Sequence, residues 1–116
     1  MQRKLRIGIN GLGRIGRQLF KLASNEEDIQ IVGINEINPD INNWAYMLNF
    51  DSIYGKLENK VKAINNNLVI NKDEIKTSSC SSIKDIPIEE WDIDILVDCT
   101  GILENVINSK YLIKNK

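Results

Sequence analysis

Histidine is absent from this chain of 116 residues. The absence removes the usual general base near neutral pH and the commonest metal ligand, and it excludes any His-dependent catalytic pair within the chain. Cysteine is scarce as well: Cys80 and Cys99 lack the spacing of a zinc site or of a CxxC redox motif, and two cysteines make no disulfide framework. The sequence therefore predicts no metal site and favours a reducing, cytoplasmic setting.

Long apolar runs and an excess of charge of one sign are also missing. After the basic N-terminus the apolar residues extend only over positions 7–9, which is too short for a signal peptide or a membrane span. The 15 basic and 16 acidic side chains leave a net charge of −1, which supplies no field to draw nucleic acid or anionic lipid. We therefore expect no nucleic-acid partner and no membrane partner.

Only two prolines and seven glycines are present, and no linker rich in Pro, Gly or Ser divides the chain. With 42% hydrophobic and 27% charged residues, the length fits one ordinary hydrophobic core and is too short for two. We therefore expect a single domain over residues 1–116.

The order of the first apolar segments predicts a βαβ unit. Residues 5–10 form a short apolar run that ends at Gly11, which is typical of a strand buried on both faces of a parallel sheet. A second run of this kind covers residues 29–34. Between the two runs, from Arg14 to Ser24, apolar residues recur at helical spacing: Ile15, Leu19, Leu22 and Ala23. Strand, helix and strand in about 30 residues imply a parallel pair with a right-handed crossover.

The remainder is expected to extend the same sheet. Residues 42–49 predict a short helix, residues 60–64 and 68–70 a hairpin around an asparagine turn, and residues 74–77 a further strand. Polar residues 78–85 are expected to form a loop, residues 86–91 a helical turn, residues 93–99 a buried strand and residues 103–112 a helix. The predicted fold class is α/β, with a Rossmann-like, doubly wound, mostly parallel sheet that is truncated at its C-terminal end.

The glycines at positions 11, 13 and 16 match the pattern GxGxxG. Such a pattern by itself also fits an ordinary glycine-rich turn. Its position directly after a predicted strand and at the start of a predicted helix favours dinucleotide binding, as does Glu36, 20 residues beyond Gly16. Gly11 permits the turn, Gly13 lets a pyrophosphate approach the backbone, and Gly16 lets the helix pack closely. The helix N-terminus favours phosphate, and Arg14 and Arg17 either add positive charge there or lie as solvated residues on the helix face.

Acidic and polar residues at two strand ends complete the predicted site. Glu36 is expected to accept hydrogen bonds from the adenosine ribose and to repel a 2′-phosphate, which predicts NAD over NADP; the alternative is a solvated charge at a strand end. Thr100 and Gly101 end another strand of the sheet, and they are candidates for the floor of the nicotinamide side or for a plain turn.

Four ordered segments resemble a known family. Residues 7–17 (IGINGLGRIGR) resemble the opening of the phosphorylating glyceraldehyde-3-phosphate dehydrogenases and of their relatives, the erythrose-4-phosphate dehydrogenases. Residues 34–36, 49–57 and 98–101 resemble later segments of the family at the same spacing, so the resemblance covers nearly the whole chain. Three positions depart from the pattern: Glu36 replaces an Asp, Tyr54 a His and Ser81 an Arg near the adenine. Glu36 with the segment Asp-Cys-Thr-Gly at 98–101 looks more like the erythrose-4-phosphate branch.

The resemblance implies NAD as cofactor and a set of contact residues. The pyrophosphate loop and the ribose site would come from the first two strand ends, and the adenine and nicotinamide-ribose side from the strand near residue 99, with Leu103 beyond it. The implied cofactor-binding residues are Asn10, Gly11, Leu12, Gly13, Arg14, Ile15, Gly16, Asn35, Glu36, Cys99, Thr100 and Gly101.

The resemblance also implies what the chain does not carry. In the family a cysteine thiolate, activated by a histidine, attacks an aldehyde before hydride transfer to NAD, and those residues lie downstream of position 116. We therefore expect an incomplete N-terminal NAD-binding domain without catalytic residues, cut from an oxidoreductase that acts on an aldehyde sugar phosphate as a homotetramer. The alternatives are a fragment of an erythrose-4-phosphate dehydrogenase and a stand-alone, non-catalytic NAD-binding module.

Overall fold

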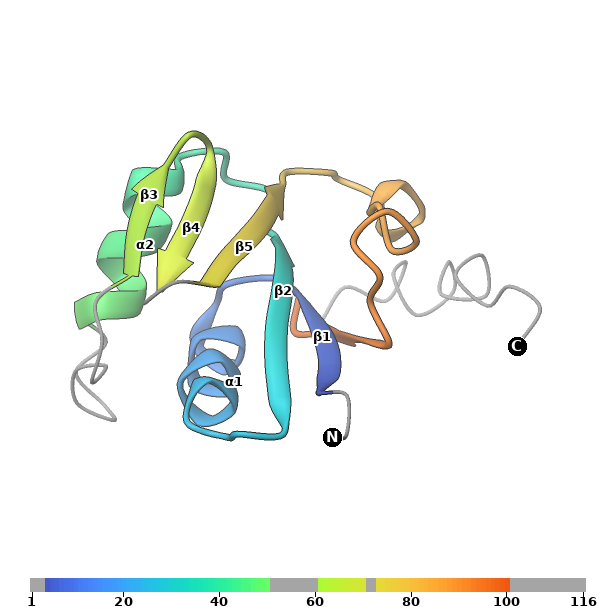
Figure 1. Ribbon diagram of the computed structural model, residues 1–116. Helices are drawn as coiled ribbons and strands as arrows, with labels where there is room; N and C mark the ends of the chain where they lie inside the picture. Colours follow the sequence, from blue (N-terminus) through green and yellow to red (C-terminus); the bar gives the residue numbers. More distant parts are fainter. Residues whose placement is uncertain (1–3, 51–60, 71–72, 101–116) are drawn as a thin grey trace.

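The structure, a computed structural model, describes residues 4–50, 61–70 and 73–100. In these residues six strands form one sheet in the order β3-β4-β5-β2-β1-β6 (Figure 1). Four strands are mutually parallel: β1 (Leu5–Asn10), β2 (Ile29–Asn35), β5 (Asp73–Ser78) and β6 (Ile95–Asp98). The other two, β3 (Val61–Ile64) and β4 (Asn67–Ile70), form an antiparallel hairpin at one edge. The predicted α/β class with a mostly parallel sheet is confirmed.

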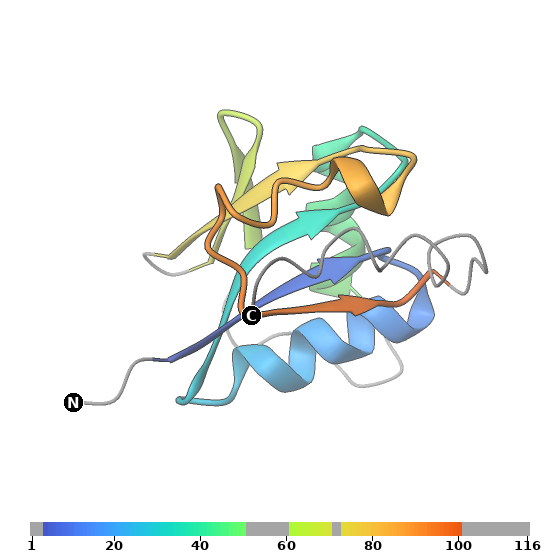
Figure 2. The same cartoon turned by 90° about the vertical axis from the view of Figure 1, so that its right-hand side faces the viewer.

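Two helices and an irregular segment cover the two faces of the sheet. Helix α1 (Arg14–Ser24) packs on β1 and β2, and α2 (Ile41–Phe50) packs on the hairpin, around the fully buried side chains of Phe20 and Trp44. Figure 2 shows α1 on one side of the sheet and the segment around the 3-10 helix η1 (Ile83–Asp85) on the other. That segment encloses a second apolar cluster of five residues: Val32, Ile83, Ile86, Trp91 and Ile93.

Of the four apolar residues that form the expected stripe of α1, only Leu19 and Ala23 face the core. The helix has the predicted bounds, but Ile15 and Leu22 are 66% and 68% exposed, whereas Gly16, Phe20 and Ala23 face the core. The reason lies at the first turn, where Gly16 has to face the strand end at Gly11. This contact fixes the rotation of the helix about its axis, and it turns Ile15 and Leu22 toward solvent.

The asparagine turn of the hairpin is confirmed. Asn65 and Asn66 adopt φ values of 51° and 65°, so both central residues have the left-handed backbone that a two-residue type I′ turn requires. Asparagine tolerates this conformation better than most residues because its short side chain can hydrogen-bond locally. The hairpin therefore owes its tight connection to these two residues.

The connection between β5 and β6 is more regular than expected. Residues 78–85 were predicted as a loop, but η1 forms within them, with the Ser82 hydroxyl accepting from the Lys84 N–H at 3.4 Å. The helical turn expected at residues 86–91 is present, since the Trp91 N–H donates to the Pro87 carbonyl at 3.0 Å. Short polar segments of this kind carry too little periodicity to reveal a single 3-10 turn.

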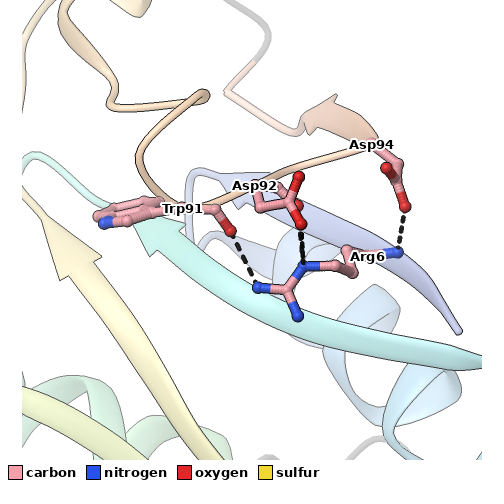
Figure 3. Close-up of polar contacts among 4 residues, drawn as sticks. All are labelled: Arg6, Trp91, Asp92 and Asp94. Atoms are coloured by element: carbon pink, nitrogen blue, oxygen red, sulfur yellow. Dashed lines mark hydrogen bonds and ion pairs between the residues drawn. The ribbon is translucent and has the colours of Figure 1, made fainter. Parts of the chain in front are cut away.

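Arg6 attaches this connection to the start of β1 (Figure 3). Its Nη2 donates to the Trp91 carbonyl at 3.0 Å and its Nε to the Asp92 carbonyl at 2.8 Å. The Arg6 backbone N–H donates to the Asp94 carboxylate at 2.9 Å. One residue thus holds the segment that leads into β6.

Strand β6 differs from its prediction in length and burial. It spans four residues, where residues 93–99 were predicted, and Ile95 is 47% exposed. Because β6 is the last strand in the order of the described sheet, it has a neighbour on one side only, β1. The helix predicted for residues 103–112 falls outside the described residues. No helix within the described ranges is long and apolar enough to cross a membrane.

Candidate functional site

The glycine loop (residues 11–16) joins the end of β1 to the start of α1. Gly11 has a φ of +101°, a conformation that side-chain-bearing residues rarely adopt, and its N–H donates to the Asn35 carbonyl at 2.8 Å. A Cβ at Gly11 would come within 2.9 Å of the Thr100 methyl group, and one at Gly16 within 2.0 Å of the Gly11 carbonyl oxygen. Both glycines are therefore required by the backbone itself.

The start of α1 is open to a ligand. Gly13 precedes the helix without a side-chain cap, and apart from its two chain neighbours no described residue has an atom within 4 Å of the position of its absent Cβ. The first turn of α1 contains no acidic residue. Its N–H groups and the positive end of the helix dipole therefore meet space that an anion can enter.

Arg17 lies beneath the glycine loop. Its Nη1 donates to the Leu12 carbonyl at 2.9 Å and contacts the Met47 sulfur at 3.6 Å. The side chain thus supports the loop from the side of α2. Arg14, by contrast, is exposed at the first position of α1.

Glu36 follows β2 and reaches the glycine loop. Its Oε1 accepts from the Leu12 N–H at 2.8 Å, and its Oε2 accepts from the Asn38 N–H at 2.9 Å. Each carboxylate oxygen has a second lone pair, so two further hydroxyl donors can bind there. The hydrogen bond from Leu12 therefore holds the Glu36 carboxylate beside the glycine loop, where phosphate binding is expected.

Asn10 and Asn35 lie under the site with their side chains buried. Their exposures are 4% and 3%, and Asn35 Nδ2 donates to Asn10 Oδ1 at 2.8 Å. Asn10 Nδ2 donates to Asp98 at 3.3 Å. Both residues were expected among the cofactor contacts, and the structure places their side chains among other protein groups.

Thr100 and Cys99 follow β6 on the far side of Gly11. The same Asp98 oxygen accepts from the Thr100 hydroxyl at 2.7 Å and from the Thr100 N–H at 3.2 Å. Burial raises the pKa of the half-buried Cys99 thiol, and the Asp98 carboxylate raises this pKa further. Cys99 is therefore held as a neutral thiol. Gly101 and Leu103 lie outside the described residues.

These segments enclose a pocket of about 60 Å³ at the carboxyl ends of the parallel strands. Its lining residues are Asn10, Gly11, Asn35, Glu36, Ile37, Cys80, Ser81 and Thr100. Sequence reasoning did not assign Ile37 or Cys80 to the site, and it gave Asp98 no role of its own. Cys80 could have been assigned to the site because it follows the predicted strand that became β5, and ligands of parallel α/β sheets bind beyond the carboxyl ends of the strands.

A larger cavity of about 340 Å³ lies elsewhere, beside the turn at Trp91. Its lining mixes two cations, Arg6 and Lys76, with two carboxylates, Glu74 and Glu90, and Glu74 pairs with Lys76 at 2.9 Å. It includes neither the glycine loop nor a helix N-terminus. The chemistry of its lining therefore makes the smaller pocket the candidate ligand site, although the other cavity is larger.

The sequence matches proteins of one named family. Residues 5–106 match the family described as glyceraldehyde 3-phosphate dehydrogenase, NAD binding domain. The glyceraldehyde-3-phosphate dehydrogenase of Buchnera aphidicola subsp. Schizaphis graminum is 44% identical over 101 residues, which cover 84% of this chain and 29% of that protein. The cytosolic enzyme of Trypanosoma brucei brucei and the enzyme of Geobacillus stearothermophilus are 40% and 38% identical, with the same coverage. The chain thus spans less than a third of the length of these relatives.

Proposed function

This chain belongs to the glyceraldehyde 3-phosphate dehydrogenase family, and we propose that its glycine loop and Glu36 bind NAD. The observation that carries the proposal is the 2.8 Å hydrogen bond from the Leu12 N–H to the Glu36 carboxylate. It places a carboxylate suited to ribose hydroxyls directly beside the helix N-terminus suited to phosphates. NAD, when bound, supplies the site that accepts a hydride.

The pyrophosphate would lie on the open start of α1. Gly13 leaves room for it, and the N–H groups of the first helical turn would donate to its oxygens. Arg14 is exposed beside this space and adds positive charge, while Arg17 supports the loop from below. Leu12, Ile15 and Gly16 contribute backbone to the same turn.

The adenosine ribose would bind at Glu36. Its oxygens, already oriented by the Leu12 and Asn38 N–H groups, would accept from the two ribose hydroxyls. A 2′-phosphate at the same place would bring negative charge against this carboxylate, which is the physical reason for selectivity toward NAD. Thr100 and Cys99, with Gly101 beyond them, would line the other end of the cofactor.

For the longer protein we propose the activity named for its relatives. The chain would then be the N-terminal, NAD-binding part of a cytoplasmic homotetramer that oxidises an aldehyde sugar phosphate. This part alone would carry no catalytic step, because it has no histidine and because its two cysteines lie at the ends of β5 and β6.

Isothermal titration of the 116-residue chain with NAD and with NADP tests the proposal. We expect NAD to bind and NADP to bind at least about tenfold more weakly, since one unfavourable charge contact of about 1.4 kcal/mol has this effect. Glu36→Gln should reduce the difference between the NAD and NADP affinities, because the substitution removes the negative charge and keeps one side-chain oxygen as an acceptor. Glu74→Gln, at an exposed pair away from the loop, is the matched control and should leave both affinities unchanged. If the unchanged chain bound NADP as tightly as NAD or more tightly, the role proposed for Glu36 would be wrong.

A further inference from the structure

A network of side-chain hydrogen bonds runs beneath the pocket across the ends of all four parallel strands. Its centre is the pair Asn10 and Asn35, which occupy paired positions in the register of β1 and β2. On one side the network reaches the end of β5 at Ser78 and Cys80. On the other side it reaches the end of β6 at Asp98 and Thr100. We call this set the strand-end network.

Asn35 has no hydrogen-bonding capacity left over. Its Oδ1 accepts from the Ser78 hydroxyl at 2.6 Å and from the Cys80 N–H at 2.7 Å. Its Nδ2 donates to Asn10 Oδ1 at 2.8 Å and to the Cys80 carbonyl at 3.0 Å. A carboxamide offers two donors and two lone pairs, so all four are in use. A bound cofactor could gain a contact from this side chain only by breaking one of these bonds.

Asn10 passes the connection on to β6. Its Nδ2 donates to Asp98 Oδ1, the same atom that accepts from the Thr100 hydroxyl and N–H. Thr100 therefore takes its position from an oxygen that Asn10 also holds. The backbone adds two links, from the Gly11 N–H to the Asn35 carbonyl and from the Cys99 N–H to the Asn10 carbonyl, each at 2.8 Å.

The groups that the network holds are the walls of the pocket. Cys80 and Thr100 line it directly, and Glu36 and Gly11 each follow a network residue in the chain. We propose that Asn35 and Asn10 are positioning residues, whose side chains fix the Cys80 and Thr100 walls relative to Glu36 and so set the affinity for NAD. The inference rests on the proposed NAD binding, and it assigns these two side chains a role beneath the cofactor rather than in contact with it.

The substitution Asn35→Asp tests this role because it replaces the Nδ2 donor group by an acceptor oxygen and keeps the shape of the side chain. The carboxylate still accepts from Ser78 and Cys80, but its second oxygen now faces two acceptors, Asn10 Oδ1 and the Cys80 carbonyl. Rotating the Asn10 amide by 180° would relieve the first conflict and create another one at Asp98. A buried mismatch of this kind should weaken NAD binding by roughly tenfold or more.

The control has to separate positioning from a general loss of stability. Ile75→Val removes one methyl group from a fully buried core residue that pairs with the hairpin, away from the pocket. Both variants are titrated with NAD at a temperature at which circular dichroism shows each of them folded. We expect Asn35→Asp to lose affinity and Ile75→Val to keep it. If Asn35→Asp is folded and binds NAD like the unchanged chain, the inference is overturned.

A second pair of variants covers the case in which Asn35→Asp does not fold. Asn10→Asp sets a carboxylate 3.3 Å from the Asp98 carboxylate and should weaken NAD binding. Adding Asp98→Asn removes the repulsion between the two carboxylates, but one amide atom cannot both donate to residue 10 and accept from the Thr100 N–H. The double variant should therefore bind more tightly than Asn10→Asp and recover only part of the affinity. Failure of the folded double variant to bind more tightly than Asn10→Asp would count against the network.

Amide hydrogen exchange gives a readout that does not require NAD. The Thr100 N–H lies at the far end of the network from Asn35, and the inference expects its exchange to accelerate in Asn35→Asp but not in Ile75→Val. If the unchanged chain binds no NAD, the proposed function fails, and faster exchange at Thr100 would still establish the coupling. An unchanged exchange rate of the Thr100 N–H in Asn35→Asp would overturn the inferred coupling between Asn35 and Thr100.

Discussion

Gly16 lies against the carbonyl oxygen of Gly11, so closely that a Cβ at position 16 would come within 2.0 Å of that oxygen. The obstructing atom belongs to the backbone and cannot rotate away. The start of α1 can therefore pack against the end of β1 only because residue 16 has no side chain. This contact fixes both the glycine loop and the rotation of the helix.

The first prediction concerns Gly16→Ala. Alanine favours helices by about 1 kcal/mol over glycine, which by itself would stabilise α1. The clash should outweigh this gain, lower the free energy of unfolding in urea and abolish NAD binding in calorimetry. Gly13→Ala is the matched control: its φ of −74° suits alanine and no described atom lies nearby, so the fold should persist while NAD binding weakens. An intact, NAD-binding Gly16→Ala variant would contradict the account of the loop.

The second prediction concerns the attachment made by Arg6. Arg6→Met keeps the apolar stem and removes the hydrogen bonds to the Trp91 and Asp92 carbonyls. We expect a loss of about 1–3 kcal/mol in unfolding free energy, because the partly buried Trp91 carbonyl loses a charged donor. Lys76→Met, which breaks the exposed pair with Glu74, should lower the unfolding free energy less than Arg6→Met does. Equal losses in the two variants would show that Arg6 is no more than a surface charge.

The third prediction uses the hairpin turn. Asn66 has a φ of 65°, and Asn-Gly is the preferred pair for a type I′ turn. Asn66→Gly should therefore raise the midpoint of thermal unfolding, and the backbone carbonyl of residue 66 remains available to the Thr77 hydroxyl. Asn66→Ala should lower it, by about 1 kcal/mol in stability, since alanine is strained in this conformation. A midpoint that moves the other way in either variant would argue against the turn.

The fourth prediction concerns pH. Burial and Asp98 raise the pKa of the Cys99 thiol in the folded chain above its ordinary value of 9.0. Below pH 9.0 both states keep the proton and stability is unaffected. Above it the unfolded chain releases the proton first, so stability falls as pH rises. The unfolding midpoint of the unchanged chain should therefore drop more steeply on alkalinisation than that of Cys99→Ser, and parallel curves would contradict the shift.

The first strand and the helix of the βαβ unit could be predicted from sequence to the residue, and the second strand to within one residue. The apolar run before Gly11 and the helical spacing from Arg14 to Ser24 are local signals, and β1 and α1 have the predicted bounds. Glu36 could be placed at the site by its distance along the chain from the glycines, and the structure brings it to Leu12.

Features that depend on neighbours could not be predicted in this way. The exposure of Ile95 follows from the position of β6 in the sheet order, and that of Ile15 from the rotation of α1 against Gly11. The pairing of Asn10 with Asn35 depends on the register of β1 and β2, which no single segment encodes. Sequence patterns therefore identified most of the elements and the cofactor class, and tertiary packing decided which side chains are buried and which line the pocket.

The pairing of β6 with β1 determines when the pocket can form during synthesis of the chain. Asn10 and Asp98 are separated by 88 residues, although their side chains share a hydrogen bond. During synthesis the glycine loop leaves the ribosome long before Thr100 exists, and contacts between residues so distant in sequence form late in folding. A nucleotide would meet the assembled pocket only after β6 has paired with β1. Cofactor binding can then stabilise the folded chain by mass action, but it cannot guide the earlier steps of folding.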